Sequence, residues 1–125
     1  MADHIDNYTE EMADAEYHVP RIINTQHEAI KALKEVRSLA KKAYKAGNLA
    51  LLSALHEATA PLHHLCKECC EQVFSLSEHL KEADRTGAEK DAHNLKEEAD
   101  RIFDEILADA NALEIELELG SQDEY

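Results

Sequence analysis

The sequence predicts an all-α protein, an antiparallel up-and-down bundle of the four-helix type with one short helix at the N-terminus. Composition gives the first indication. The 125 residues include only three glycines, two prolines and no tryptophan, whereas helix-favouring alanine, leucine, glutamate and lysine are abundant. Periodicity gives the second indication, because apolar residues recur in alternating steps of three and four, as in helices that pack lengthwise.

The short first helix is predicted over residues 3–18, with Asp3 as its N-cap. Its apolar positions keep the helical spacing, at Ile5, Tyr8, Met12, Ala15 and Val19. Pro20 lacks a backbone donor and disfavours helical geometry at the preceding residue. We therefore expect a tight corner at Pro20, with a kink as the alternative.

The second helix is predicted from Pro20 to Ala46, because proline is favoured at the first position of a helix. Its inward line comprises Ile22, Gln26, Ala29, Leu33, Val36, Ala40 and Ala43. Gly47 follows where helices commonly end in the left-handed conformation. The outward side is basic, with Lys31, Lys34, Lys41, Lys42 and Lys45.

The third helix is predicted to begin after an Asn48 cap and to run to about Asp84. Its clearest apolar line is Leu62, Cys66, Cys69, Val73, Leu76, Leu80 and Ala83. The heptad phase continues unshifted through Pro61. We therefore expect either one long helix kinked at Pro61 or a break there, with two helices stacked end to end.

The last helix is predicted over residues 87–119, because Thr86 and Glu89 have the spacing of a capping box. Its inward line is Leu95, Ala99, Ile102, Ile106, Ala110, Leu113 and Leu117, and its outward side is acidic. Gly120 is expected to end the helix, which leaves residues 120–125 as a frayed acidic tail. Residues 1–125 form a single bundle domain in this prediction.

The net charge of −14, from 27 acidic and 13 basic residues, argues against nucleic acid as a partner, because the protein repels phosphate backbones. No apolar run approaches the roughly 18 residues of a membrane span, so we expect no membrane association. The acidic N-terminus lacks the features of a secretory signal, which predicts a cytoplasmic protein. Three closely spaced cysteines do not suggest a disulfide framework.

These features predict a protein that is not an enzyme and acts through its outer helix faces. The basic second helix and the acidic last helix are expected to be neighbours, or else to mediate contact with a protein partner or self-association into a homo-oligomer. No nucleophile elbow and no glycine-rich phosphate loop is present in the sequence.

A metal site is the first alternative function. His63, Cys66 and Cys70 follow one another at helical spacing, and imidazole with thiolate suits Zn²⁺ or Cu(I). His63 and Cys70 are separated by about 10.5 Å of helix rise, so other helices would have to supply further ligands. The competing interpretation is that Cys66 and Cys69 are small core residues.

A second set comprises His27, His64-x-x-x-Glu68 and His93-x-x-x-Glu97. This order resembles the hemerythrin-like family, in which histidines and carboxylates on bundle helices hold two irons. The heptad frame places His27, His64 and His93 away from the inward lines, and the chain has no Glu-x-x-His pair. We therefore do not expect a di-iron site.

The segment Ala92-His93-Asn94-Leu95-Lys96 resembles the opening motif of histidine phosphotransfer domains, which are helical bundles of similar size. The resemblance implies His93 as phospho-acceptor, with Lys96 steadying the transferred group. Glu97 stands where the family has glycine, and it places negative charge beside an incoming acyl phosphate. Phosphotransfer through His93 is the second alternative, and a plain surface histidine is the simpler interpretation.

Overall fold

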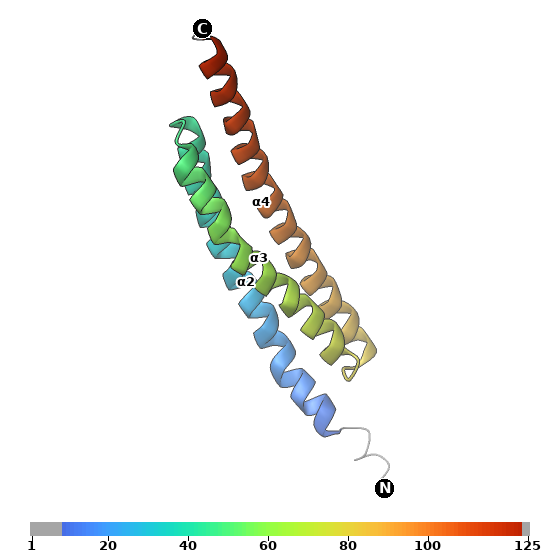
Figure 1. Cartoon of the computed structure of the whole chain (residues 1–125). Helices are drawn as coiled ribbons and strands as arrows, with labels where there is room; N and C mark the ends of the chain where they lie inside the picture. The colour runs from blue at the N-terminus through green and yellow to red at the C-terminus, as the bar shows by residue number, and fades with distance from the viewer. Residues whose placement is uncertain (1–8, 124–125) are drawn as a thin grey trace, which may run out of the picture.

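The computed structural model describes residues 9–123, with side chains through Gly120, and three long helices account for almost all of them. With the labels of Figure 1, these helices are α2 (Glu10–Lys45), α3 (Leu49–Ser77) and α4 (Glu82–Asp123). Consecutive helices run antiparallel in an elongated bundle, so α2 and α4 are parallel, and each helix contacts the other two. The all-α prediction is confirmed, but the four-helix prediction is wrong, because the described residues form three helices.

The expected corner at Pro20 is absent, and the predicted first and second helices are one helix, α2. Thr9 caps it by accepting a hydrogen bond from the Met12 amide at 3.2 Å. Buried residues keep their phase across the proline, with Val19 before it and Gln26 after it. Continuous packing of these buried residues therefore offsets the loss of the one backbone hydrogen bond that Pro20 cannot donate. Residues 1–8, where the first helix was predicted to begin, lie outside the described part.

Of the two alternatives at Pro61, one long helix is confirmed and a break is excluded, because α3 continues through this proline as one helix. Thr59 and Cys66, on either side of Pro61, are both fully buried. Pro61 itself is exposed. Its ring therefore faces solvent, and the buried line of α3 remains unbroken.

The turn between α2 and α3 follows the prediction. Gly47 has φ +68°, which is the left-handed conformation that glycine adopts without a Cβ clash. The Asn48 side chain accepts a hydrogen bond from the Leu51 amide at 3.1 Å and caps α3.

The turn between α3 and α4 lies earlier than predicted, because α3 ends at Ser77 rather than near Asp84. Thr86 is not a cap; it lies inside α4, where its hydroxyl donates to the Glu82 carbonyl. Glu89 instead accepts a hydrogen bond from the Ser77 hydroxyl at 2.7 Å, across the turn. This contact between Ser77 and Glu89 holds the turn in place. The capping box predicted from the spacing of Thr86 and Glu89 is not formed.

The far end of α4 also departs from the prediction, since the helix continues past Gly120 to Asp123. Gly120 does not adopt a positive φ, so nothing in its backbone terminates the helix. Figure 1 shows that this end of α4 extends beyond the turn between α2 and α3. Ile115, Leu117 and Leu119 are therefore exposed there.

The side chain of Gln26 connects all three helices. It is fully buried, and its Nε2 donates to the carbonyl oxygens of Cys66 at 3.0 Å and Ala92 at 3.2 Å. Its Oε1 has no hydrogen-bond partner among the described residues. Because one amide reaches α3 and α4 together, Gln26 fixes the axial register of the bundle.

Ion pairs along the outside confirm that the basic side of α2 faces the acidic side of α4. Three pairs follow one another, Lys34–Glu98 at 3.0 Å, Arg37–Glu105 at 3.6 Å and Lys41–Asp109 at 3.7 Å. Such solvent-exposed pairs each contribute less than about 1 kcal/mol. They orient the two helices more than they stabilise the fold.

Two substitutions at Gln26 distinguish the stability that comes from its packing from the stability that comes from its hydrogen bonds. We expect Gln26→Ala to lower the free energy of unfolding by about 2–3 kcal/mol, through a cavity and two lost hydrogen bonds. Gln26→Leu should stay within about 1 kcal/mol of the wild type, because it fills the space and removes an unpaired buried oxygen. Urea denaturation followed by circular dichroism measures both, and equal losses in the two variants would contradict this account of Gln26.

Candidate functional site

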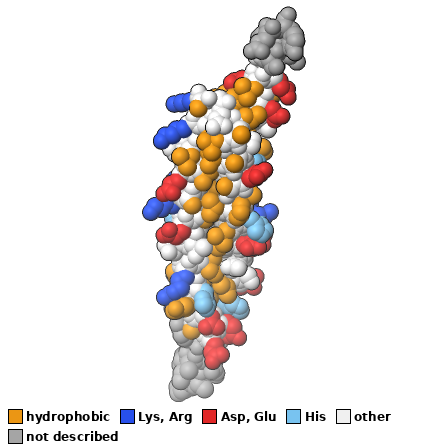
Figure 2. Space-filling model, turned by 60° about the vertical axis from the view of Figure 1, so that its left-hand side comes forward, with side chains coloured by type: hydrophobic (Ala, Val, Ile, Leu, Met, Phe, Trp, Pro, Cys, Tyr) orange, Lys and Arg blue, Asp and Glu red, His pale blue; other side chains and the backbone are white. Residues whose placement is uncertain are grey.

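The most extensive candidate site is an apolar surface along the seam between α2 and α3, called here the α2–α3 face. Figure 2 shows it as a band of hydrophobic side chains along the molecule. Its residues from α2 are Ala32, Leu39 and Ala46, and those from α3 are Leu51, Leu55, Ala58, Leu62 and Leu65.

The register of α3 explains why this face is apolar. Leu52, Thr59 and Cys66 are fully buried, and the residue before each of them is Leu51, Ala58 or Leu65. One residue turns a helix by about 100°, so this second line lies beside the buried line. The opposite flank of α3 is taken by α4, to which His63 is paired through Asp100. The second line therefore stays in solvent.

The exposure of this face is large for leucine side chains. Leu39 is 50% exposed, Leu51 46% and Leu65 38%. Near the α2–α3 turn the face sinks into a hollow of about 360 Å³, lined mainly by Leu39, Leu51 and Leu55 with Lys42 at its border. A continuous apolar band with a hollow is typical of a surface that receives side chains from another helix.

The two rims of the face differ in charge. The rim on α2 carries more cations than carboxylates: Arg21, Lys31, Lys42 and Lys45 against Glu28 and Glu35. The rim on α3 carries Glu57, Glu68 and Glu71, with His64 and Lys67 among them, and His64 pairs with Glu68. In Figure 2 lysine and arginine side chains gather along the α2 edge of the band. The two long edges of the face therefore differ in net charge.

The predicted metal ligands do not converge. Cys66 donates through Sγ to the Leu95 carbonyl at 3.6 Å. His63 instead faces α4, with its Nε2 2.6 Å from Asp100 Oδ1 and its ring stacked on Phe103 at 4.6 Å between centroids. Within residues 9–123 no three His, Cys, Asp or Glu side chains are grouped so as to hold a metal ion. Zn²⁺ or Cu(I) at His63, Cys66 and Cys70 stays a prediction without geometric support.

All three cysteines are buried free thiols. Burial raises the pKa of Cys66 to about 11, with a smaller contribution from neighbouring Cys69. Burial likewise raises the pKa of Cys69 and of Cys70. The thiols are therefore protonated at neutral pH, and both metal ligation and nucleophilic attack require the thiolate.

The remaining histidine candidates lie on the surface. The side chains of His64 and His93 are 69% and 52% exposed, and each pairs with the glutamate one turn along its own helix. His27 is exposed as well. The three side chains therefore do not gather inside the bundle, as a di-iron site would require. His93 remains accessible, but its Nε2 lies 3.0 Å from Glu97 Oε1.

No family model, no curated protein and no solved structure matches this chain. The resemblances to hemerythrin-like proteins and to phosphotransfer domains therefore rest only on the residues quoted for them. None of the helices within residues 9–123 combines the length and the apolar character needed to cross a bilayer.

Two features of the site were missed from the sequence. The interaction surfaces predicted from the sequence are the charged outer faces of the second and last helices, although Leu51, Ala58 and Leu65 repeat at heptad spacing. This repeat lies one position before the buried line of α3, and it is the sequence pattern that indicates the face. Gln26 was assigned to the inward line, but nothing in the sequence shows that its amide reaches two helices.

The raised thiol pKa values predict a loss of stability in alkali. An unfolded cysteine ionises near 9.0, whereas folded Cys66 ionises near 11. The unfolded state therefore binds fewer protons between these values, and the free energy of unfolding should fall as pH rises from 9 to 11. Urea denaturation at several pH values measures this slope.

Cys66→Ala provides the control. This variant should be less stable at pH 7, but its loss of stability above pH 9 should be shallower, because one of the titrating thiols is gone. Identical slopes for the wild type and Cys66→Ala would show that Cys66 does not ionise in this way.

Proposed function

We propose that the protein is a non-enzymatic interaction protein that self-associates through the α2–α3 face. The exposed leucine line, Leu39, Leu51 and Leu65, carries this proposal. Large apolar patches on soluble proteins commonly mark protein–protein contacts. A second copy brings an identical apolar band, and isologous two-fold contacts are the commonest form of homo-oligomer.

The two-fold axis is proposed to run along the band, parallel to the helices. In this arrangement α2 of each copy lies on α3 of its partner, and neighbours among these four helices are antiparallel. The four helices at the interface then form an up-and-down bundle from two chains. The four-helix architecture expected of one chain would arise in the dimer.

The charges of the rims support this axis over the alternative. With the axis along the band, the basic rim of α2 meets the acidic rim of α3 of the partner copy. With the axis across the band, α2 meets α2 and α3 meets α3, so like charges face each other. Complementary rims steer association and disfavour the wrong pairing, which matters for a chain with net charge −14.

The other predicted roles receive less support. A Zn²⁺ or Cu(I) site needs ligands that converge, and His63 is turned toward Asp100 instead. Phosphotransfer through His93 needs an approach free of negative charge, and Glu97 lies beside its ring. We further propose a cytoplasmic location, because buried free thiols are typical of proteins in reducing compartments.

Sedimentation velocity tests the proposal. The wild-type protein should sediment as a dimer of twice 14.1 kDa. The double variant Leu51→Glu/Leu65→Glu should be monomeric and fully helical, because both leucines are already partly exposed and each glutamate would be desolvated in the interface. A monomeric wild-type protein at high micromolar concentration would contradict self-association.

Matched controls separate this face from general surface effects. Leu107→Glu changes a leucine that is 36% exposed on α4, outside the α2–α3 face, and should leave the dimer intact. His93→Gln should leave it intact as well. If Leu107→Glu dissociates the dimer as fully as the double variant, the contact lies elsewhere.

A further inference from the structure

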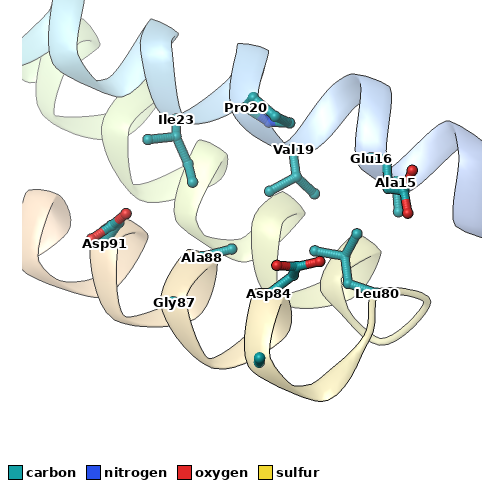
Figure 3. A pocket seen from close by; sticks show the side chains of 11 residues that line it. Ala15, Glu16, Val19, Pro20, Ile23, Leu80, Asp84, Gly87, Ala88 and Asp91 are labelled. Atoms are coloured by element: carbon teal, nitrogen blue, oxygen red, sulfur yellow. The ribbon is translucent and has the colours of Figure 1, made fainter.

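A groove lies between the first turns of α4 and the N-terminal half of α2, away from the α2–α3 face. Its volume is about 540 Å³. Figure 3 shows Val19 and Ile23 pointing from α2 toward α4, where Gly87 and Ala88 present almost no side chain. Because Gly87 and Ala88 have little or no side chain, the space opposite Val19 and Ile23 is left unfilled.

The floor of the groove is apolar and its edge is acidic. Val19, Ile23, Leu80 and Ala88 supply the apolar lining. Asp84 and Asp91 flank the gap on α4 in Figure 3. A third carboxylate, that of Glu16, lines the groove from α2.

The acidic edge interrupts the charge pattern of the α2–α4 seam. Farther along this seam, Glu98, Glu105 and Asp109 on α4 each pair with a cation of α2. Beside the groove, α2 presents Pro20 and Ile23 instead of a cation. Neither Asp84 nor Asp91 has an ion pair or hydrogen bond through its side chain with any described residue.

Two arginines of α2 and α4 pair with residues outside the groove. The Arg21 guanidinium lies over the Tyr17 ring, 3.5 Å from its centroid, and donates to the Tyr17 carbonyl. Arg85 pairs with Glu89. Neither arginine pairs with Asp84 or Asp91, and both carboxylates are exposed at the edge of the groove.

We propose that this groove binds a basic amphipathic helix of a partner protein. One or two apolar side chains of that helix enter the gap over Gly87, against Val19 and Ile23. Lysine or arginine side chains on either side pair with Asp84 and Asp91, which are separated by about 10.5 Å of helix rise, or two turns. Long basic side chains suit this arrangement, because their aliphatic stems cover apolar surface while their charges stay at the edge.

The groove lies on the α2–α4 side, so it stays open when the α2–α3 face is covered. The inference therefore does not depend on self-association. A monomeric protein can bind the helix, and a dimer can bind two.

Fluorescence anisotropy with a designed probe tests the inference on the full chain. The probe is a labelled 14-residue amphipathic peptide of leucine, alanine and lysine, with lysines flanking its leucine stripe at positions seven residues apart. It should bind at micromolar concentration. A peptide with glutamate in place of lysine, and one with serine in place of leucine, should each bind at least tenfold more weakly.

Variants of the groove locate the binding site. Gly87→Leu fills the gap and should weaken binding at least tenfold; no atom lies within 4 Å of a Cβ at this position, so the variant should fold. Gly87→Ala is its matched control and should bind within threefold of the wild type. Melting curves by circular dichroism confirm that both variants are folded.

The charge test compares two double variants with the same change in net charge. Asp84→Asn/Asp91→Asn should weaken binding at least tenfold, whereas Asp104→Asn/Glu114→Gln, away from the groove, should change it less than threefold. Equal losses in the two double variants, or full binding by Gly87→Leu, would overturn the proposal, because the peptide would then be held only by the overall negative charge.

Discussion

The bundle depends on one narrow line of close packing shared by three helices. In each heptad α2, α3 and α4 contribute one fully buried residue, such as Leu33, Leu52 and Ile106. Three helices around one line bury only one stripe of each helix. The apolar arcs of α2 and α3 are wider than that stripe, so packing of the core itself leaves the α2–α3 face in solvent. Core and candidate interface thus have the same origin.

Periodicity was enough to predict the helices and their inward sides. A local rule about proline gave the wrong corner at Pro20, because it says nothing of the packing that continues a helix past one missing hydrogen bond. At Pro61 the unshifted heptad phase already allowed the continuous helix that the structure has. The sequence prediction also failed at the turn after α3. There the contact between Ser77 and Glu89 depends on three-dimensional proximity, whereas the capping-box spacing at Thr86 is purely local.

The candidate site was predictable only in part. Histidines and cysteines were predicted to bind metal or carry phosphate because of their chemistry. In the fold, Cys66 is a buried thiol and His63 pairs with Asp100 across the α3–α4 seam. Which side of a helix meets a neighbour depends on the arrangement of all three helices. The sequence therefore contained the leucine line of α3, but only the structure shows that no described residue covers it.

The most direct test of this account is one distance between two copies. A spin label at position 14, introduced as a noncanonical amino acid so that the native thiols stay intact, can be measured by pulsed electron paramagnetic resonance. An axis along the α2–α3 face places the two labels within about 35 Å, because neighbouring helix axes lie about 10 Å apart. A two-fold axis perpendicular to the helices instead separates the two labels by about 60 Å along the helix direction. A short distance is the predicted result, and a long distance or no dipolar coupling would contradict it.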